Sequence, residues 1–329
     1  MAECPPVGLG ASWVNRMPLG LLDSLAFSLP EIEVTDRVIA LSSRQENRVL
    51  VANRAFTRRV VFGRMGGGPG DLKGPAELRG VPRGLAVLEA GNGRVSFWSL
   101  EGAYLGAVKT GGASGGFAVD DRGHVFTGSS VGSAYLRESW DGDNARALGE
   151  RPAATPDSWL DLVTRAPDGT LWVFDNAQRT IVMLAPDGRL LRRVGLPPSV
   201  DVAVARAVRE TDREFRSRGM GGATAALRAF RFVNDGRLFL RTTGEGPFAL
   251  LVRPDNLQCV ALTLPSDPAA RDVLHGAYTM TVADDTLFVV SDEGQVRQFP
   301  LPPAARRDAA GAGATPAPAA ASSPPRSPN

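Results

Sequence analysis

One seven-residue pattern recurs six times along the chain, and this repetition limits the folds that the chain can adopt. Each copy begins with a turn residue or arginine, continues through β-branched, aromatic or leucine positions, and ends in a small or polar residue. The copies are NRVLVAN (47–53), RGLAVLE (83–89), GHVFTGS (123–129), GTLWVFD (169–175), GRLFLRT (236–242) and DTLFVVS (285–291). Such a segment is typical of a β-strand that is entered by a turn and buried on both faces. The sequence therefore predicts one β-unit repeated every 40–50 residues or so, roughly the period of propeller blades.

Shorter apolar segments flank the copies. One lies upstream, as in VIALSS (38–43) and FRFVND (230–235), and two lie downstream, as in TIVMLAPDG (180–188) and RLLRRVG (189–195). Turn-forming pairs such as Asp-Gly separate these segments. Each unit therefore contains four strands, and six units closing in a ring would shield the edges of the sheets. The sequence predicts an all-β, six-bladed β-propeller with four-stranded blades.

The propeller is expected to span residues 21–301. Its last unit offers only three strands before a proline-rich tail, so a strand within 21–30 is expected to complete the sixth blade. Residues 1–20 are expected to form a loose segment. Residues 302–329 are rich in Ala, Pro, Gly and Ser, a composition that cannot bury a core, so this tail is expected to be disordered.

The longest interval between copies carries helical periodicity. One face of the segment 201–219 collects Val204, Val208, Thr211 and Phe215, and Gly219 is a stop signal. An amphipathic helix inserted after the last strand of blade four is therefore predicted. It is either a passive insertion, or a lid or partner contact on the face where the strand copies end.

Composition excludes several classes of function. The chain has 329 residues, and 37 Lys and Arg against 35 Asp and Glu leave a net charge of +2, too small for a chain-wide polyanion-binding field. With only three Tyr for base stacking, nucleic acid is not an expected partner. His124 and His275 are the only histidines and exclude a three-histidine metal centre. Cys4 and Cys259 are too few for a disulfide framework, and Cys4 is expected to be a free thiol. No apolar window is long enough for a transmembrane helix, and the sequence as given shows no signal peptide.

Two stretches resemble a known family. GRMGGGPGDLKGP (63–75) and PDGTLWVFDNAQRTIVMLAPDGRLLRRVG (167–195) are similar to the NHL-type six-bladed propellers of bacteria, a resemblance that covers about residues 32–301. Ser129 and Thr242 depart from it, because they stand where the family favours Asp. The resemblance implies a binding scaffold, although some relatives are lyases and more distant ones calcium-dependent lactonases. Similar propellers are often exported, but the sequence leaves the compartment of this protein open.

The polar ends of the strand copies are expected to meet around the central channel on one face. The candidate ligand-binding residues are Asn53, Arg54, Glu89, Asp175, Asn176, Arg179, Thr242 and Asp292. Arg94 and Arg241 lie beside the same loops and would add to a cationic ring. Glu89, Asp175, Asn176 and Asp292 offer oxygen ligands for Ca²⁺. Alternatively, these side chains cap their own turns.

No set of residues in the sequence assembles a catalytic constellation. The glycine-rich stretch 66–70 lacks the GK[ST] ending of a phosphate-binding loop and is expected to be a connection between blades. The sequence therefore predicts a monomeric, non-catalytic module that needs no cofactor and binds a protein, peptide or small ligand on its top face. The alternative is a calcium-dependent, lactonase-like hydrolase or a lyase acting at the mouth of the channel.

Overall fold

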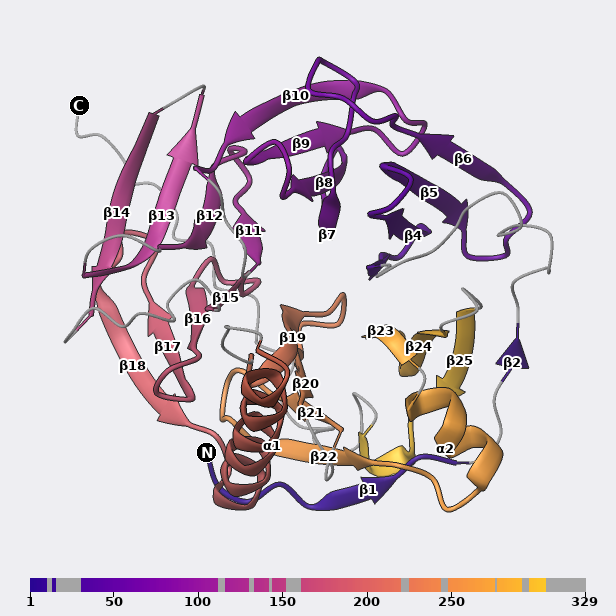
Figure 1. The fold of residues 1–329 in the computed structure, drawn as a ribbon, viewed down its shortest axis with the longest axis vertical. Helices are drawn as coiled ribbons and strands as arrows, with labels where there is room; N and C mark the ends of the chain where they lie inside the picture. The colour runs from indigo at the N-terminus through magenta and orange to yellow at the C-terminus, as the bar shows by residue number, and fades with distance from the viewer. Residues whose placement is uncertain are drawn as a thin grey trace, which may run out of the picture.

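The computed structural model confirms the six-bladed propeller (Figure 1). It describes residues 1–10, 14–15, 31–111, 116–129, 133–141, 144–151, 161–219, 225–243, 248–275, 277–291 and 296–305. Blade one holds β3 (Ile32–Val34), β4 (Val38–Ser43), β5 (Arg48–Asn53) and β6 (Arg59–Phe62). Blade two holds β7 (Pro75–Val81), β8 (Gly84–Glu89), β9 (Arg94–Trp98) and β10 (Tyr104–Lys109). Blade three holds β11 (Phe117–Val119), β12 (Val125–Gly128), β13 (Ala134–Trp140) and β14 (Asn144–Glu150).

The second half of the ring repeats this plan. Blade four holds β15 (Leu162–Arg165), β16 (Leu171–Asp175), β17 (Thr180–Leu184) and β18 (Leu190–Gly195). Blade five holds β19 (Leu227–Phe232), β20 (Leu238–Thr242), β21 (Ala249–Val252) and β22 (Cys259–Thr263), with β1 (Pro6–Gly8) added outside. Blade six holds β23 (Ala277–Ala283), β24 (Thr286–Ser291), β25 (Val296–Pro300) and β2 (Val14–Asn15). Within each blade the consecutive strands are antiparallel, and the first strand lies nearest the centre of the ring.

The two faces of the disc carry different turns. We call the upper face the one that carries the turns between the second and third strands of each blade. The lower face is the opposite one, and it carries the turns between the first and second strands and between the third and fourth strands. Five of the six sequence copies are second strands and end at the upper face. The copy in blade one, residues 47–53, is instead the third strand, β5, so it ends at the lower face. The short first strand β3 was not predicted from the sequence, so the assignment in this blade was one strand out of register.

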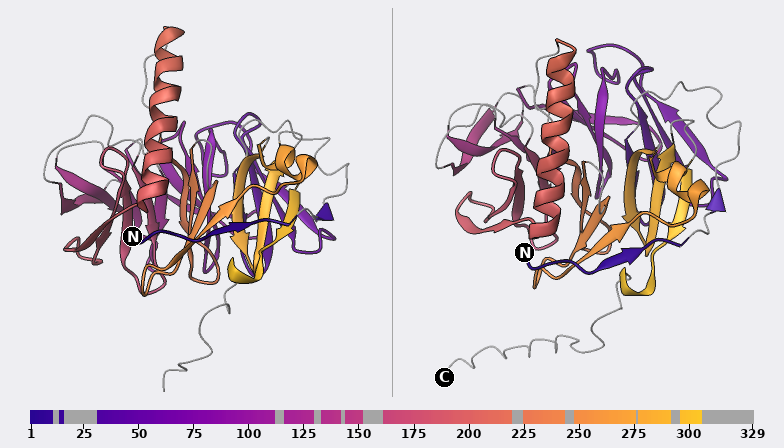
Figure 2. Two further views of the ribbon diagram at one scale, coloured as in Figure 1. Left: turned by 90° about the horizontal axis from the view of Figure 1, so that it is seen from below. Right: turned by 60° about the horizontal axis from the view of Figure 1, so that its bottom comes forward.

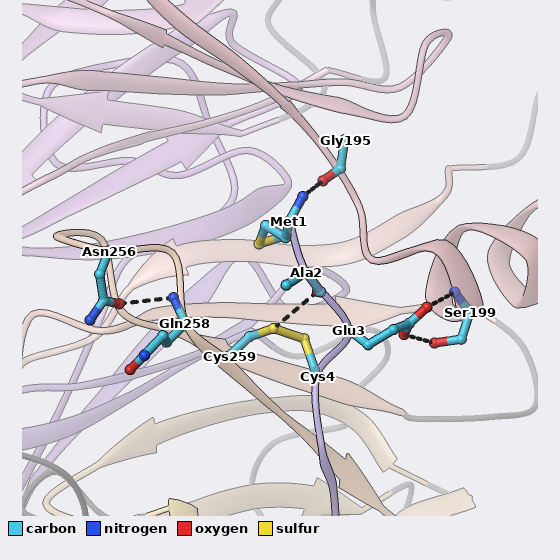
Figure 3. The surroundings of a disulfide bond; sticks show 9 residues. All are labelled: Met1, Ala2, Glu3, Cys4, Gly195, Ser199, Asn256, Gln258 and Cys259. Atoms are coloured by element: carbon cyan, nitrogen blue, oxygen red, sulfur yellow. Dashed lines mark hydrogen bonds between the residues drawn. A yellow bond between two sulfur atoms is a disulfide. The ribbon is translucent and has the colours of Figure 1, made fainter.

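The N-terminal residues form a strap along the outer edges of blades four to six (Figures 1 and 3). The amino group of Met1 donates to the carbonyl oxygen of Gly195, and β1 pairs in parallel with β22. A disulfide joins Cys4 to Cys259, so the expectations of a free Cys4 thiol and of a loose segment are wrong over residues 1–10. Edge pairing and the covalent link hold a segment whose composition alone predicts no strand.

An N-terminal strand does complete blade six, although not the one expected. Val14 of β2 pairs with Gln298 and Asn15 with Arg297, so β2 occupies the outer edge of β25, the place expected from the sequence for residues 21–30. The segment 21–30 itself lies outside the described residues.

The inserted helix is confirmed as α1 (Pro198–Ser217), whose Val200 and Val204 pack into the core of blades four and five, and whose Ala207 is also buried. A second helix, α2 (Pro268–His275), precedes blade six and was not predicted.

The C-terminal tail is described only to Ala305. The first turn of the tail, η2 (Pro303–Ala305), is anchored by Arg237, which donates to the buried carbonyl oxygen of Ala305. The prediction that the tail is disordered from residue 302 is therefore wrong for residues 302–305. From residue 306 the tail lies outside the described part of the chain.

Apolar residues of the strands fill the spaces between neighbouring blades. No helix among the described residues is long and apolar enough to cross a membrane.

Candidate functional site

Asn53 and Arg54 do not belong to the predicted upper-face site. Because β5 is a third strand, both lie at the lower face. Asn53 caps its own turn: its Oδ1 accepts hydrogen bonds from the backbone N–H groups of Thr57 (2.8 Å) and Arg58 (3.0 Å). Arg54 pairs with Asp284, in the turn between β23 and β24, at 2.7 Å. These contacts join blade one to blade six and leave neither side chain at the upper mouth of the channel.

Glu89 is fully buried at the upper end of β8 and is held by its own blade. One carboxylate oxygen accepts from Arg94 Nε at 2.9 Å, and the other from Asn92 Nδ2 at 2.6 Å. The Arg94 guanidinium also donates to the carbonyl oxygens of Gly67, Gly68 and Asp71. The glycine-rich stretch is thus folded over blade two, as its interpretation as a blade connection requires. Glu89 acts as the anchor of that connection.

The polar residues after β16 have structural partners too. Asp175 is 1% exposed and caps its turn by accepting from the backbone N–H of Gln178 at 3.0 Å. Asn176 Oδ1 accepts from the N–H of Ala226 at 2.7 Å, which links the turn to the start of blade five. Arg179 pairs with Asp201 in the first turn of α1 at 2.6 Å. The capping interpretation therefore holds for Asp175, while Asn176 connects blade four to blade five and Arg179 connects it to α1.

The structure does not bring the calcium candidates together among the residues it describes. Thr242 is buried at the end of β20, and Asp292 lies outside the described residues. Within the described ranges, no group of three or more His, Cys, Asp and Glu side chains could hold a metal ion. Since Glu89 already accepts from an arginine and an amide, its carboxylate is satisfied without a cation. The calcium site remains a prediction that the described carboxylates do not support.

A charged network that sequence reasoning missed crosses the channel instead. Arg231, 3% exposed on β19, donates to Glu31 Oε2 at 3.1 Å and to the carbonyl oxygen of Ile32 at 2.6 Å. Its guanidinium also lies 3.4 Å from Glu33. Burial raises the pKa of the Glu31 and Glu33 carboxyls, and the charge of Arg231 opposes that shift. A side chain of blade five is therefore joined to the inner strand of blade one through the centre of the ring.

Other inner strands join the same network. Glu77 of β7 pairs with Arg79, and its Oε2 accepts from the N–H of Phe117 in β11 at 3.1 Å. Thr279 of β23 donates to Glu31 Oε2 at 3.2 Å. Glu33 Oε1 accepts from the N–H of Gly80 in β7 at 2.9 Å, so polar contacts connect the inner strands of blades one, two, three, five and six. The sequence carries one signal for this network. Acidic and apolar residues alternate over Glu31, Ile32, Glu33 and Val34, and the two apolar residues pack in the core.

The network separates two cavities. The lower mouth holds about 750 Å³ and is lined by the turns after β3, β7, β19 and β23. The upper mouth holds about 270 Å³, and Arg44, Arg228, Arg231, Glu31 and Glu77 are among its lining residues. Arg231 lines both, so its ion pairs form the floor between them.

Positive charge is in excess at the upper mouth. Arg44 and Arg228 are exposed there, and neither side chain has a hydrogen-bond or ion-pair partner among the described residues. Nearby Arg241 is 8% exposed, and burial together with the charge of Arg228 lowers its pKa to about 10. Burial is the larger cause of this lowering, and the positive charge of Arg228 adds to it. The two exposed guanidiniums, Arg44 and Arg228, are therefore the groups at the upper mouth that could attract an anion.

The inserted helix stands beside this mouth without covering it. Figure 2 shows α1 projecting from the upper face, away from the disc, and not lying across the centre. Its buried residues all belong to its first three turns. The lid position considered from the sequence is therefore not the one that the helix occupies here.

Comparisons with known proteins show the fold and no more. No family profile and no curated protein matches the sequence. A catalytically inactive virginiamycin B lyase from Staphylococcus aureus, in a structure with quinupristin, is similar at 11% identity, with a TM-score of 0.55, over 88% of this chain and 98% of that one. A putative exported protein from Bacteroides fragilis is similar at 9% identity and a TM-score of 0.57, over 90% and 99%. A protein of unknown function from Bacteroides thetaiotaomicron is similar at 9% identity and a TM-score of 0.54, over 89% and 74%. The chain shares the six-bladed propeller fold with these proteins.

Proposed function

We propose that the protein is a monomeric, non-catalytic propeller of the NHL-like type that binds a small anionic ligand at the upper mouth of its channel. The observation that carries the proposal is the pair of exposed guanidiniums, Arg44 and Arg228, that line a 270 Å³ cavity without partners among the described residues. Arginine presents a planar fork of donors that matches carboxylate and phosphate oxygens. A ligand bound there would rest on the floor formed by Arg231.

The network below the cavity supports binding in preference to catalysis. Arg231, Glu31 and Glu33 already satisfy one another, and Glu77 is paired with Arg79. A general base or nucleophile needs a side chain that is free to exchange a proton or form a bond with the ligand. His124 lines a cavity on the lower face and is not among the described residues that line the upper mouth.

The experiment is a calorimetric titration of the full chain with succinate and, separately, with inorganic phosphate. We expect one of them to bind, and Arg44→Gln and Arg228→Gln each to weaken it about tenfold, the effect of losing one charge-assisted hydrogen bond. Arg58→Gln is the matched control, because Arg58 is an exposed arginine on the lower face. Equal affinity in all three variants, or no binding of either anion, would contradict the proposal.

A further inference from the structure

A second cavity, on the lower face between blades two and three, has the composition of a ligand pocket. It holds about 620 Å³, within the range of pockets for small organic molecules. Its apolar wall comes mainly from blade two, with Phe97, Leu105 and Val108, of which Leu105 is 52% exposed. Its polar wall comes from blade three, with His124 and Trp140. The cavity is separate from the upper mouth, so this inference is independent of the proposed function.

His124 is held in a fixed orientation at this cavity. Its Nδ1 lies 2.7 Å from Oε1 of Glu138, whose side chain is 4% exposed, and Arg146 pairs with the other oxygen of the same carboxylate. An ionised carboxylate can only accept, so Nδ1 carries the proton and Nε2 is left for a ligand. The indole ring of Trp140 lies beside the imidazole, with ring centroids 5.7 Å apart. The two ring planes are tilted by 32°, and both residues line the cavity.

Hydrogen-bond donors at the cavity exceed the acceptors left for them. Trp98 and Trp172 donate their indole N–H to side-chain hydroxyls, whereas that of Trp140 has no partner in the described part of the chain. The guanidiniums of Arg83 and Arg122 also line the cavity and have no partner within those ranges. Of the three carboxylates that line the cavity, two are engaged elsewhere, whereas that of Asp141 has no partner among the described residues. Asp120 accepts from the backbone N–H groups of Arg122 and His124, and Asp121 pairs with Arg165.

We propose that this cavity binds an aromatic carboxylate. The ring would lie between the apolar wall of blade two and the Trp140 indole, which offers an aromatic face for stacking. The carboxylate would accept from the side-chain donors of Trp140, Arg83 and Arg122, because charge-assisted bonds of this kind are the strongest available to such a site. Glu138 acts as a positioning residue that fixes the ring of His124.

The test uses 2-naphthoate as the probe and two-dimensional NMR of the full chain as the readout. The chain has only two histidines, so the imidazole signals of His124 can be assigned with the variant His275→Gln. We expect 2-naphthoate to shift the His124 imidazole and Trp140 indole N–H signals. We expect Trp140→Phe, which keeps a ring but removes the donor, to weaken binding about tenfold.

The neutral isostere 2-naphthamide separates the two parts of the argument. Binding at least tenfold weaker than that of 2-naphthoate is expected if the anionic group is recognised. Equal affinity for both probes would overturn the carboxylate assignment. Absence of any shift at His124 and Trp140 with either probe at millimolar concentration would overturn the site. Arg58→Gln, on the lower face in another blade, is the control for charge lost away from the cavity and is expected to bind 2-naphthoate as the native chain does.

Discussion

At the scale of single residues, Asp161 carries the clearest electrostatic signature in the protein. Its carboxyl is fully buried beside Arg151 and accepts from the N–H of Asn176 at 2.9 Å. Burial raises its pKa from 3.8 to about 6, although the hydrogen bonds and the charge of Arg151 oppose the shift. Desolvation therefore outweighs a direct ion pair, as is usual when two charges leave water together.

This shift predicts a dependence of stability on pH. The folded state holds the Asp161 proton more tightly than the unfolded state does, so the contribution of Asp161 to the free energy of unfolding is greatest below pH 4 and is lost as pH rises through 6. The loss amounts to about 3 kcal/mol at most, since one pKa unit corresponds to about 1.36 kcal/mol. Urea unfolding at a series of pH values should show the native chain losing that stability relative to Asp161→Asn. If the free energy of unfolding changed equally with pH in the two proteins, the prediction would be contradicted.

Strand-end residues show what sequence alone can establish about a site. The repeat correctly predicted that Glu89 and Asp175 end second strands at one face. It did not predict their partners, because Arg94 and the glycine-rich connection meet Glu89 only once the chain has folded. The channel network was missed for the same reason. Arg231 and Glu31 are far apart in sequence and meet across the ring, a pairing for which local pattern carries no signal.

At the scale of elements, the errors follow from strand length and edge position. Five of the six copies were assigned correctly because long strands buried on both faces have a clear apolar pattern. In blade one the first strand, β3, has only three residues, one of them acidic, and β4 and β5 are alike in burial. The sequence copy in this blade was therefore assigned to the second strand, although it is the third. Strands β1 and β2 add to existing sheet edges, and their sequences have no pattern of their own.

Helix α1 is expected to be well ordered at its base and weakly protected at its free end. Pro197 provides no side-chain cap, and the carboxylate of Glu3 instead accepts from the backbone N–H of Ser199 at 3.0 Å. A lost cap typically costs about 0.5–2 kcal/mol, so Glu3→Ala should speed hydrogen exchange in the first turn of α1. Glu210→Ala is the matched control, because it removes an exposed pair with Arg206 higher on the helix. Equal exchange in the first turn of all three proteins would show that the strap does not cap α1.

At the scale of the whole molecule, the strap determines how firmly the ring is closed. Residues 1–15 contact blade four through Met1, blade five through Cys4 and β1, and blade six through β2. Among the described residues, the pairing of β2 with β25 adds an N-terminal strand to the last blade, and the segment before β2 is fixed covalently at the Cys4–Cys259 disulfide. These cysteines are 255 residues apart, so the crosslink constrains most of the unfolded chain of 329 residues.

Reduction of this disulfide should lower the melting temperature. A native disulfide typically contributes about 2–4 kcal/mol, and in a domain of this size each kcal/mol corresponds to roughly 2–4 °C. Calorimetric melts with and without a phosphine reductant measure the effect, and the double variant Cys4→Ser, Cys259→Ser should melt at the reduced temperature whether or not reductant is present. Because β1, β2 and Glu3 remain in place, we expect the reduced protein to stay folded with its propeller intact. A melting temperature that reductant leaves unchanged in the native chain would mean that the disulfide does not stabilise the propeller.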